Sequence, residues 1–216
     1  DSLRKLEYRG YDSAGIAVIE DGSIKTVKAK GRINKGLVPR LEEAPRFKAV
    51  TGIGHTRWAT HGEPSDINSH PIGNSRVTIV HNGIIENYKK LKSFLVGKGY
   101  VFESETDTET AAKLIDYYYK GDPVDDISKA VTDIEGAYSL GIIFKDHPDR
   151  IYAVRKDSPL IVGSSDSGMF IASDMTALLE YTKKYYLLET GEIAELSPNS
   201  VSFCDIHGNA IEKEIQ

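Results

Sequence analysis

The chain has 216 residues, 40% of them hydrophobic, which is enough to bury a substantial core, and we expect one domain. Its formal net charge of −5 argues against a nucleic-acid partner, because phosphate contacts need clustered Lys and Arg. The single cysteine, Cys204, excludes an internal disulfide and every multi-cysteine metal site. With neither a signal peptide nor an apolar run of bilayer length, we expect no membrane contact and a cytoplasmic protein.

The N-terminal part of the chain predicts mainly strands. Residues 1–6 read as the start of a helix. AGIAVIE (14–20) and SIKTVKA (23–29) flank Asp21-Gly22, which predicts a β-hairpin because Gly tolerates positive φ. KAVTGIG (48–54) and RVTIVHN (76–82) are further strand candidates.

Helical patterns occupy the middle of the chain. Apolar residues from Ile84 to Leu95 recur at helical spacing and stop near Gly97. Thr106-Asp107-Thr108-Glu109 predicts a capping box at the start of a second helix. A third helix is expected to begin near Pro123 and to end at Gly136.

Short alternating runs return after Gly136, with a small helix expected at 175–181. The strand candidates are 137–144, 150–154, 159–163, 168–173, 185–189, 192–196 and 200–205. Because strands and helices are segregated along the chain, the sequence predicts a layered α+β domain and not a repeating βαβ unit.

Four histidines raise the question of a metal site: His55, His61, His70 and His81. Their spacing matches no standard zinc motif, and no helical HExxH arrangement is present. We therefore predict solvated or hydrogen-bonded imidazoles, no metal and no cofactor.

The segment Arg57-Trp58-Ala59-Thr60-His61-Gly62 follows a predicted strand and reads as a loop at a sheet edge. Arg57 offers a bidentate fork for a carboxylate, Thr60 and His61 offer further hydrogen bonds, and Trp58 could exclude water. The residues are equally compatible with a surface loop that the tryptophan anchors to the core.

Two further motifs have both a chemical and a plain interpretation. His81-Asn82-Gly83 is predicted where a strand ends and a helix begins, which suits an oxyanion hole, but Asn-Gly is also an ordinary turn. Asp107 could bind a substrate ammonium or favour the positive end of a helix dipole. Together with Arg57, these residues describe a pocket for a free amino acid whose side-chain acyl group is attacked, but they include no nucleophile.

Five segments in this order resemble a known family: LEYRGYDSAG (6–15), HTRWATHGEP (55–64), His70-Pro71, VHNGIIEN (80–87) and SETDTE (104–109). They are similar to the glutaminase domain of the glutamine:fructose-6-phosphate aminotransferase family, and the similarity extends over nearly the whole chain. The resemblance implies an N-terminal-nucleophile fold, a four-layer αββα sandwich of two antiparallel sheets between helical layers. It also implies hydrolysis of L-glutamine, with ammonia passed to a separate sugar-phosphate isomerase domain of the same protein, which we expect to be a homo-oligomer.

The resemblance also assigns roles to individual residues. It implies that Arg57 binds the substrate α-carboxylate and that Asp107 binds the α-ammonium. The other implied site residues are Thr60 and His61 as further contacts, Trp58 in a mobile lid, the Asn82 side chain and Gly83 N–H as the oxyanion hole, and Arg9 beside the nucleophile.

The nucleophile that the resemblance implies is a cysteine at the mature N-terminus, followed by an apolar strand, and it does not occur in residues 1–216. Cys204 lies in an alternating segment and is predicted to be structural, and Ser2 is predicted to cap a helix. Omitted residues or a shortened chain are favoured over natural loss, since losing a central strand would leave backbone groups unpaired. Two alternatives stay open: a non-catalytic amino-acid-binding module, and the glutaminase part of another amidotransferase.

Overall fold

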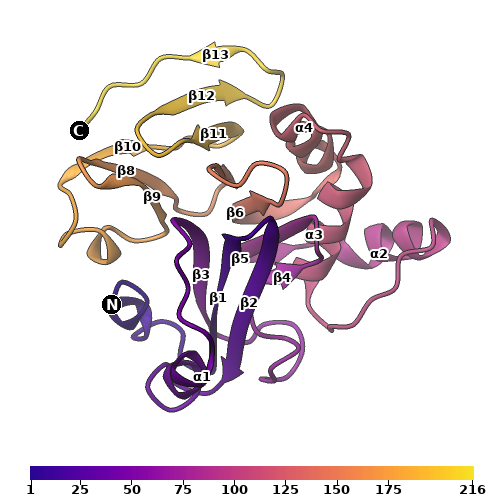
Figure 1. Ribbon diagram of the computed structural model, residues 1–216. Helices are drawn as coiled ribbons and strands as arrows, with labels where there is room; N and C mark the ends of the chain where they lie inside the picture. Colours follow the sequence, from indigo (N-terminus) through magenta and orange to yellow (C-terminus); the bar gives the residue numbers. More distant parts are fainter.

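A seven-stranded antiparallel sheet forms the centre of the computed structural model, which describes residues 1–216 (Figure 1). Its strand order is β13-β12-β11-β7-β6-β5-β4. In chain order the strands are β4 (Ile72–Gly73), β5 (Val77–Ile85), β6 (Gly136–Phe144), β7 (Ile151–Lys156), β11 (Glu192–Leu196), β12 (Val201–Asp205) and β13 (Ala210–Ile211). Strands β5 and β6 pair along their whole length, from Val77 opposite Phe144 to Ile85 opposite Gly136.

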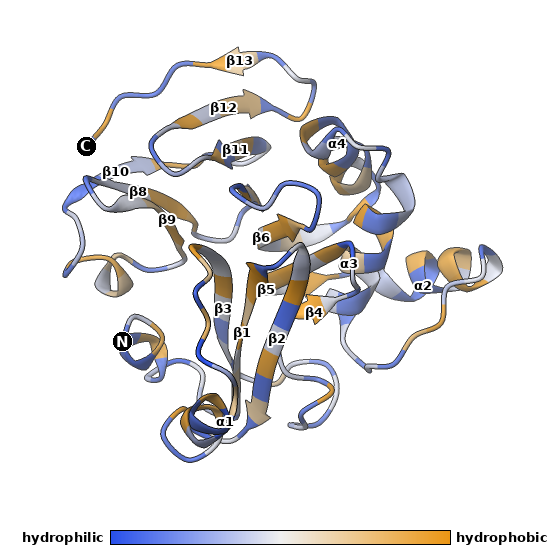
Figure 2. Cartoon of the chain, viewed as in Figure 1, coloured by the Kyte–Doolittle hydropathy of each residue, from blue (hydrophilic) through white to orange (hydrophobic).

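Two three-stranded antiparallel sheets lie on one face of the large sheet. The first has the order β2-β1-β3, with β1 (Ser13–Glu20), β2 (Ser23–Lys30) and β3 (Thr51–Arg57). The second has the order β10-β8-β9, with β8 (Ile161–Ser165), β9 (Gly168–Ala172) and β10 (Lys184–Leu187). Strands β3 and β9 are the edges that the two small sheets turn toward each other, and Figure 2 shows hydrophobic segments on both.

Helices α2 (Tyr88–Gly97), α3 (Asp107–Tyr118) and α4 (Pro123–Asp133) cover the opposite face of the large sheet. Side chains alternate across a strand, so neighbouring residues face different layers. Ile142 of β6 belongs to the core beneath the helices, whereas Ile143 packs with Ala17 and Ile53 of the first small sheet. The same alternation places Ala153 of β7 against the second small sheet.

A thin outer layer completes the sandwich. It contains α1 (Leu37–Glu43), which packs on β1 and β2, and the 3-10 turns η1 (Arg4–Leu6) and η2 (Met175–Ala177), which share a small apolar cluster. The layers are therefore helices, large sheet, two small sheets and outer helices. This arrangement confirms the predicted α+β fold with four αββα layers.

The N-termini of two helices follow their sequence signals. Thr106 Oγ1 accepts a hydrogen bond from Glu109 N at the start of α3, as predicted, but the Glu109 carboxylate bonds the Glu103 and Ser104 N–H groups and not that of Thr106. Pro123 is the first residue of α4. None of the helices combines the length and the apolar character needed to cross a membrane.

Two local predictions were wrong. The helix expected from Ile84 begins only at Tyr88, because β5 continues to Ile85 and pairs with β6 to its end. Residues 1–6 form only the 3-10 turn Arg4–Leu6, whose N-terminal flanking residue is Leu3, so Ser2 is not a helix cap. Helix α1 (Leu37–Glu43) was not predicted.

Candidate active site

One cavity of about 210 Å³ brings together every residue predicted for the site. Three structural elements and two loops supply them. Arg57 ends β3, Asn82 and Gly83 belong to β5, and Asp107 opens α3. Trp58, Thr60 and His61 lie in the loop after β3, and Arg9 lies in the loop after η1. The cavity thus lies where the first small sheet, the large sheet and the helical layer meet. Sequence reasoning missed several other lining residues, which are Thr56, Thr106, Thr108, Pro159 and Ser173.

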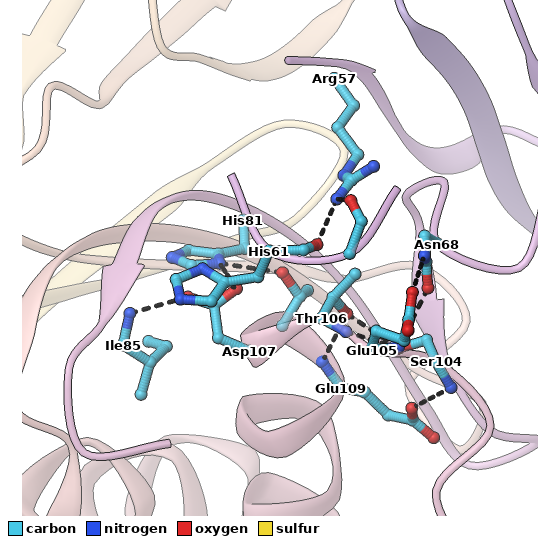
Figure 3. A network of polar contacts seen from close by, with 12 residues as sticks. Arg57, His61, Asn68, His81, Ile85, Ser104, Glu105, Thr106, Asp107 and Glu109 are labelled. Carbon is cyan, nitrogen blue, oxygen red and sulfur yellow. Dashed lines mark hydrogen bonds and ion pairs between the residues drawn. The ribbon is translucent and has the colours of Figure 1, made fainter. Parts of the chain in front are cut away.

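Asp107 lines the cavity, and its carboxylate lies beside His61 and His81 (Figure 3). Its side chain is buried, and Oδ2 accepts a 2.8 Å hydrogen bond from the backbone N–H of Ile85. Oδ1 lies 3.9 Å from Nδ1 of both His61 and His81. Because the positive end of the α3 dipole also favours an anion here, the site holds a fixed negative charge that can receive a cation.

Arg57 is not the free two-pronged fork that the sequence suggested. Its Nη2 donates to the carbonyl oxygens of His61 and Gly62, the latter at 3.0 Å, so half of the guanidinium fixes the loop after β3. Nη1 is buried and has no hydrogen-bond partner. A buried donor without a partner is costly, and an anion in the cavity would satisfy it.

The loop after β3 is also fastened at other points. The Trp58 ring is 58% exposed and meets the Tyr11 ring edge-on, with centroids 5.2 Å apart. Ala59 N donates to the Asp12 carboxylate, and Asn68 bonds both the Glu63 carbonyl and Glu105. Closure of this loop over a ligand stays a prediction.

Asn82 and Gly83 lie inside β5, so the prediction that a strand ends and a helix begins at these residues was wrong, and they do not form the alternative Asn-Gly turn. Asn82 pairs with Ser139 and Gly83 with Tyr138 of β6. Gly83 has φ +122°, a conformation that residues with a side chain rarely adopt. A Cβ at this position would lie 2.0 Å from the Ala137 carbonyl oxygen, so glycine is required by the close approach of the two strands.

We expect Gly83→Ala to destabilise the fold by about 2 kcal/mol or more, because the new methyl group meets backbone and the left-handed conformation is strained. The matched control is Gly97→Ala at the end of α2, where an added Cβ meets nothing within 4 Å. Thermal unfolding of both variants measures the difference. Equal melting temperatures would show that β5 and β6 separate easily at this point.

Three buried imidazoles form a stack beneath the cavity. The ring centroids of His55 and His70 are 4.4 Å apart, and those of His70 and His81 are 6.4 Å apart. Thr108 Oγ1 bridges His70 Nε2 and His81 Nδ1, at 3.0 Å each, and His55 Nε2 lies 2.8 Å from Asn82 Oδ1. The second nitrogen of each ring is buried without a partner, but no group of three or more His, Cys, Asp or Glu side chains is arranged to hold a metal ion, so a site without a metal stays our prediction.

Burial lowers the pKa of all three histidines, and that of His55 falls from 6.5 to about 4. Below pH 6.5 these histidines therefore bind protons in the unfolded chain but not in the folded chain. The free energy of unfolding is fully retained above pH 6.5 and decreases as the pH falls toward 4. His55 alone should lower the free energy of unfolding by about 2 kcal/mol between pH 7 and pH 5. Urea unfolding at the two pH values measures this decrease. The His55→Gln variant, which cannot titrate at this position, should lose less free energy of unfolding between pH 7 and pH 5. An equal loss in both proteins would contradict the lowered pKa of His55.

Arg9 is positioned by the second small sheet. It donates to the Ser173 hydroxyl and, at 3.5 Å, to the Ser173 carbonyl just after β9. Cys204 lies in β12 and is not among the residues that line the cavity. Burial raises the pKa of its thiol, which disfavours the reactive thiolate and agrees with a structural role.

A second, mainly apolar cavity of about 440 Å³ opens onto the first one. Its walls are β3 and β9, its floor includes Val80 and Gly141 of the large sheet, and η1 and η2 contribute Leu6 and Ala177. The two cavities share Arg9, His55, Thr56, His81, Asn82 and Ser173. An apolar groove between two sheet edges therefore leads directly to the polar site.

Comparison with known proteins decides the family. Residues 55–180, more than half of the chain, match the family described as glutamine amidotransferase domain. The chain belongs to this family. Glutamine–fructose-6-phosphate aminotransferases from Clostridium perfringens and Aquifex aeolicus are 54% and 48% identical over 100% and 99% of the chain. The chain spans 35% and 36% of their lengths. High identity over the whole chain, together with this partial coverage of the relatives, confirms the predicted resemblance to the glutaminase domain of this family.

Two solved structures share the fold. The glutamine phosphoribosylpyrophosphate amidotransferase of B. subtilis superposes with a TM-score of 0.80 at 24% identity, over 97% of this chain and 46% of its own. A second structure, described as the allosteric regulatory enzyme of purine biosynthesis, gives 0.82 at 25% identity, over 95% of this chain and 45% of its own. The higher identity to the aminotransferases favours them over the purine enzymes as relatives of this glutaminase domain.

Proposed function

We propose that residues 1–216 belong to one glutaminase domain, which in the complete protein hydrolyses L-glutamine to glutamate and ammonia. The observation that carries the proposal is the pairing of two buried groups in one cavity, the Asp107 carboxylate and the Arg57 Nη1 donor. A free amino acid carries the complementary charges on one carbon atom. Asp107 would bind its ammonium, Arg57 its carboxylate, and Thr60 and His61 would add polar contacts.

The rest of the cavity suits attack on the substrate carboxamide. The Asn82 amide and the Gly83 N–H are placed to hold the oxygen on which negative charge develops. We assign none of the hydroxyl groups that line the cavity as the nucleophile. Ser173 accepts a hydrogen bond from Arg9, and Thr108, which does have two imidazole neighbours, is buried between His70 and His81.

The apolar groove provides a route by which a nucleophile can enter. An extended segment between β3 and β9 would pair with both edges, joining the small sheets into one, and would end at the polar cavity beside Arg9. The family resemblance implies that this segment is an N-terminal strand beginning with cysteine. Its thiolate would attack the carboxamide carbon to form a thioester, ammonia would leave with a proton returned by the cysteine's own amine, and water would then release glutamate.

The use of the ammonia is a proposal about a longer protein. The curated relatives named above are aminotransferases acting on fructose 6-phosphate, and the chain covers about a third of their length. We propose that ammonia from this domain converts fructose 6-phosphate to glucosamine 6-phosphate in an isomerase domain of the same polypeptide, within a homo-oligomer.

Substrate analogues test the proposal in the complete protein. Glutaramate lacks the α-ammonium of glutamine, and 4-aminobutanamide lacks the α-carboxylate. Ammonia release from L-glutamine should exceed that from either analogue by about a hundredfold or more in kcat/KM, because each analogue leaves a buried charged group unpaired. Comparable rates would refute the two-charge clamp, and binding of L-glutamine without ammonia release would support a non-catalytic module.

A further inference from the structure

The Asn82 amide has two ends with opposite chemistry. Its NH2 group can stabilise an oxyanion, whereas its carbonyl oxygen would repel one. Asn82 Oδ1 lies 2.8 Å from His55 Nε2, so the carbonyl end is held by the imidazole. A rotation of the amide by half a turn would break this bond and place the wrong atom in the cavity.

The bond to Asn82 fixes which His55 nitrogen carries the proton. Burial lowers the pKa of His55 to about 4, so the ring is neutral near pH 7 and has one N–H. Asn82 Oδ1 is an acceptor only, which requires that proton on Nε2. Nδ1 is buried without a partner, and this tautomer leaves there a lone pair and not an unpaired donor.

The His55 ring is itself held in place. His55 lies on β3 opposite Gly15 of β1, and its ring packs against that of His70 at an interplanar angle of 32°. His70 is in turn tied through Thr108 to His81. A buried stack that spans β3, β5 and α3 thus fixes the orientation of the donor nitrogen.

We propose that His55 is a positioning residue for glutamine hydrolysis, which acts by holding the Asn82 carbonyl so that the Asn82 NH2 group faces the developing oxyanion. The inference rests on the proposed function and deepens it. His55 takes no part in the chemistry itself. His55 therefore contributes to the rate of glutamine hydrolysis only when Asn82 is present, and it lowers the energy of the transition state without changing substrate binding.

A matched pair of amide substitutions tests the inference in the complete protein. The side-chain nitrogen of Gln occupies the place of imidazole Nε2, whereas that of Asn occupies the place of Nδ1 and does not reach Asn82. We expect His55→Asn to lower kcat for L-glutamine by about tenfold to a hundredfold with little change in KM. His55→Gln should retain most of kcat, and similar losses in both variants would overturn the proposal.

A double-mutant cycle with Asn82→Ala separates positioning from general structural damage. In the Asn82→Ala background, His55→Asn should cause little further loss, because its effect passes through Asn82. Equal losses in both backgrounds, or a change confined to KM, would overturn the inference. If Asn82→Ala alone leaves turnover unchanged, the proposed oxyanion site fails; if it slows turnover while His55→Asn does not, only the positioning role fails.

Discussion

Replacing Arg57 with Ala in the complete protein should lower kcat/KM for L-glutamine. The decrease should correspond to about 2 to 4 kcal/mol of lost transition-state stabilisation, as expected for a lost charge-assisted contact. The physical reason is that Arg57 lines the cavity that also contains Asp107 and has a buried Nη1 donor without a protein partner. Steady-state ammonia release at several glutamine concentrations measures the effect.

Arg57 also holds the His61 and Gly62 carbonyls, so a control must separate substrate binding from loop damage. The control substrate is 4-aminobutanamide, which has no carboxylate for Arg57 to bind. Its slow hydrolysis should change little in Arg57→Ala. An equal loss with both substrates would mean that Arg57 acts only by shaping the loop.

The second large effect is expected at Asn82. Asn82→Ala removes one of two proposed oxyanion donors and should slow turnover by about 10²-fold with little change in KM. The side chain is half-buried at the junction of the two cavities and belongs to none of the apolar clusters of the core, so the fold should persist. Loss of the 2.8 Å hydrogen bond to His55 Nε2 should lower the melting temperature only modestly. Unchanged turnover with an unchanged melting curve would mean that Asn82 has no catalytic role.

Local signals predicted much of the fold. The Asp21-Gly22 hairpin and the Thr106 cap depend on backbone preferences of a few adjacent residues, and both were confirmed. The extent of β5 was not predictable in this way. Asn-Gly favours a turn locally, but pairing with β6 keeps Gly83 in a strand at positive φ, and that partner lies more than fifty residues along the chain.

The candidate site shows the same limit. Residue types in the HTRWATHGEP and SETDTE segments suggested an anion and a cation site, and the structure places them in one cavity. No motif indicated that Arg57 Nη2 would bond the carbonyl oxygens of its own loop, or that His55 would contact Asn82. The His55–Asn82 contact depends on how β3 and β5 lie in different sheets, which short-range patterns do not encode.

The most direct test of the account is to locate the nucleophile in the complete protein. A glutamine analogue with an electrophilic diazoketone in place of the carboxamide would be incubated with the protein, and peptide mass spectrometry would identify the alkylated residue. We predict labelling of a cysteine at the start of the strand that fills the groove between β3 and β9, and protection by L-glutamate. Labelling of Cys204 or Ser2, or labelling that L-glutamate does not reduce, would contradict the assignment of this cavity as the glutaminase site.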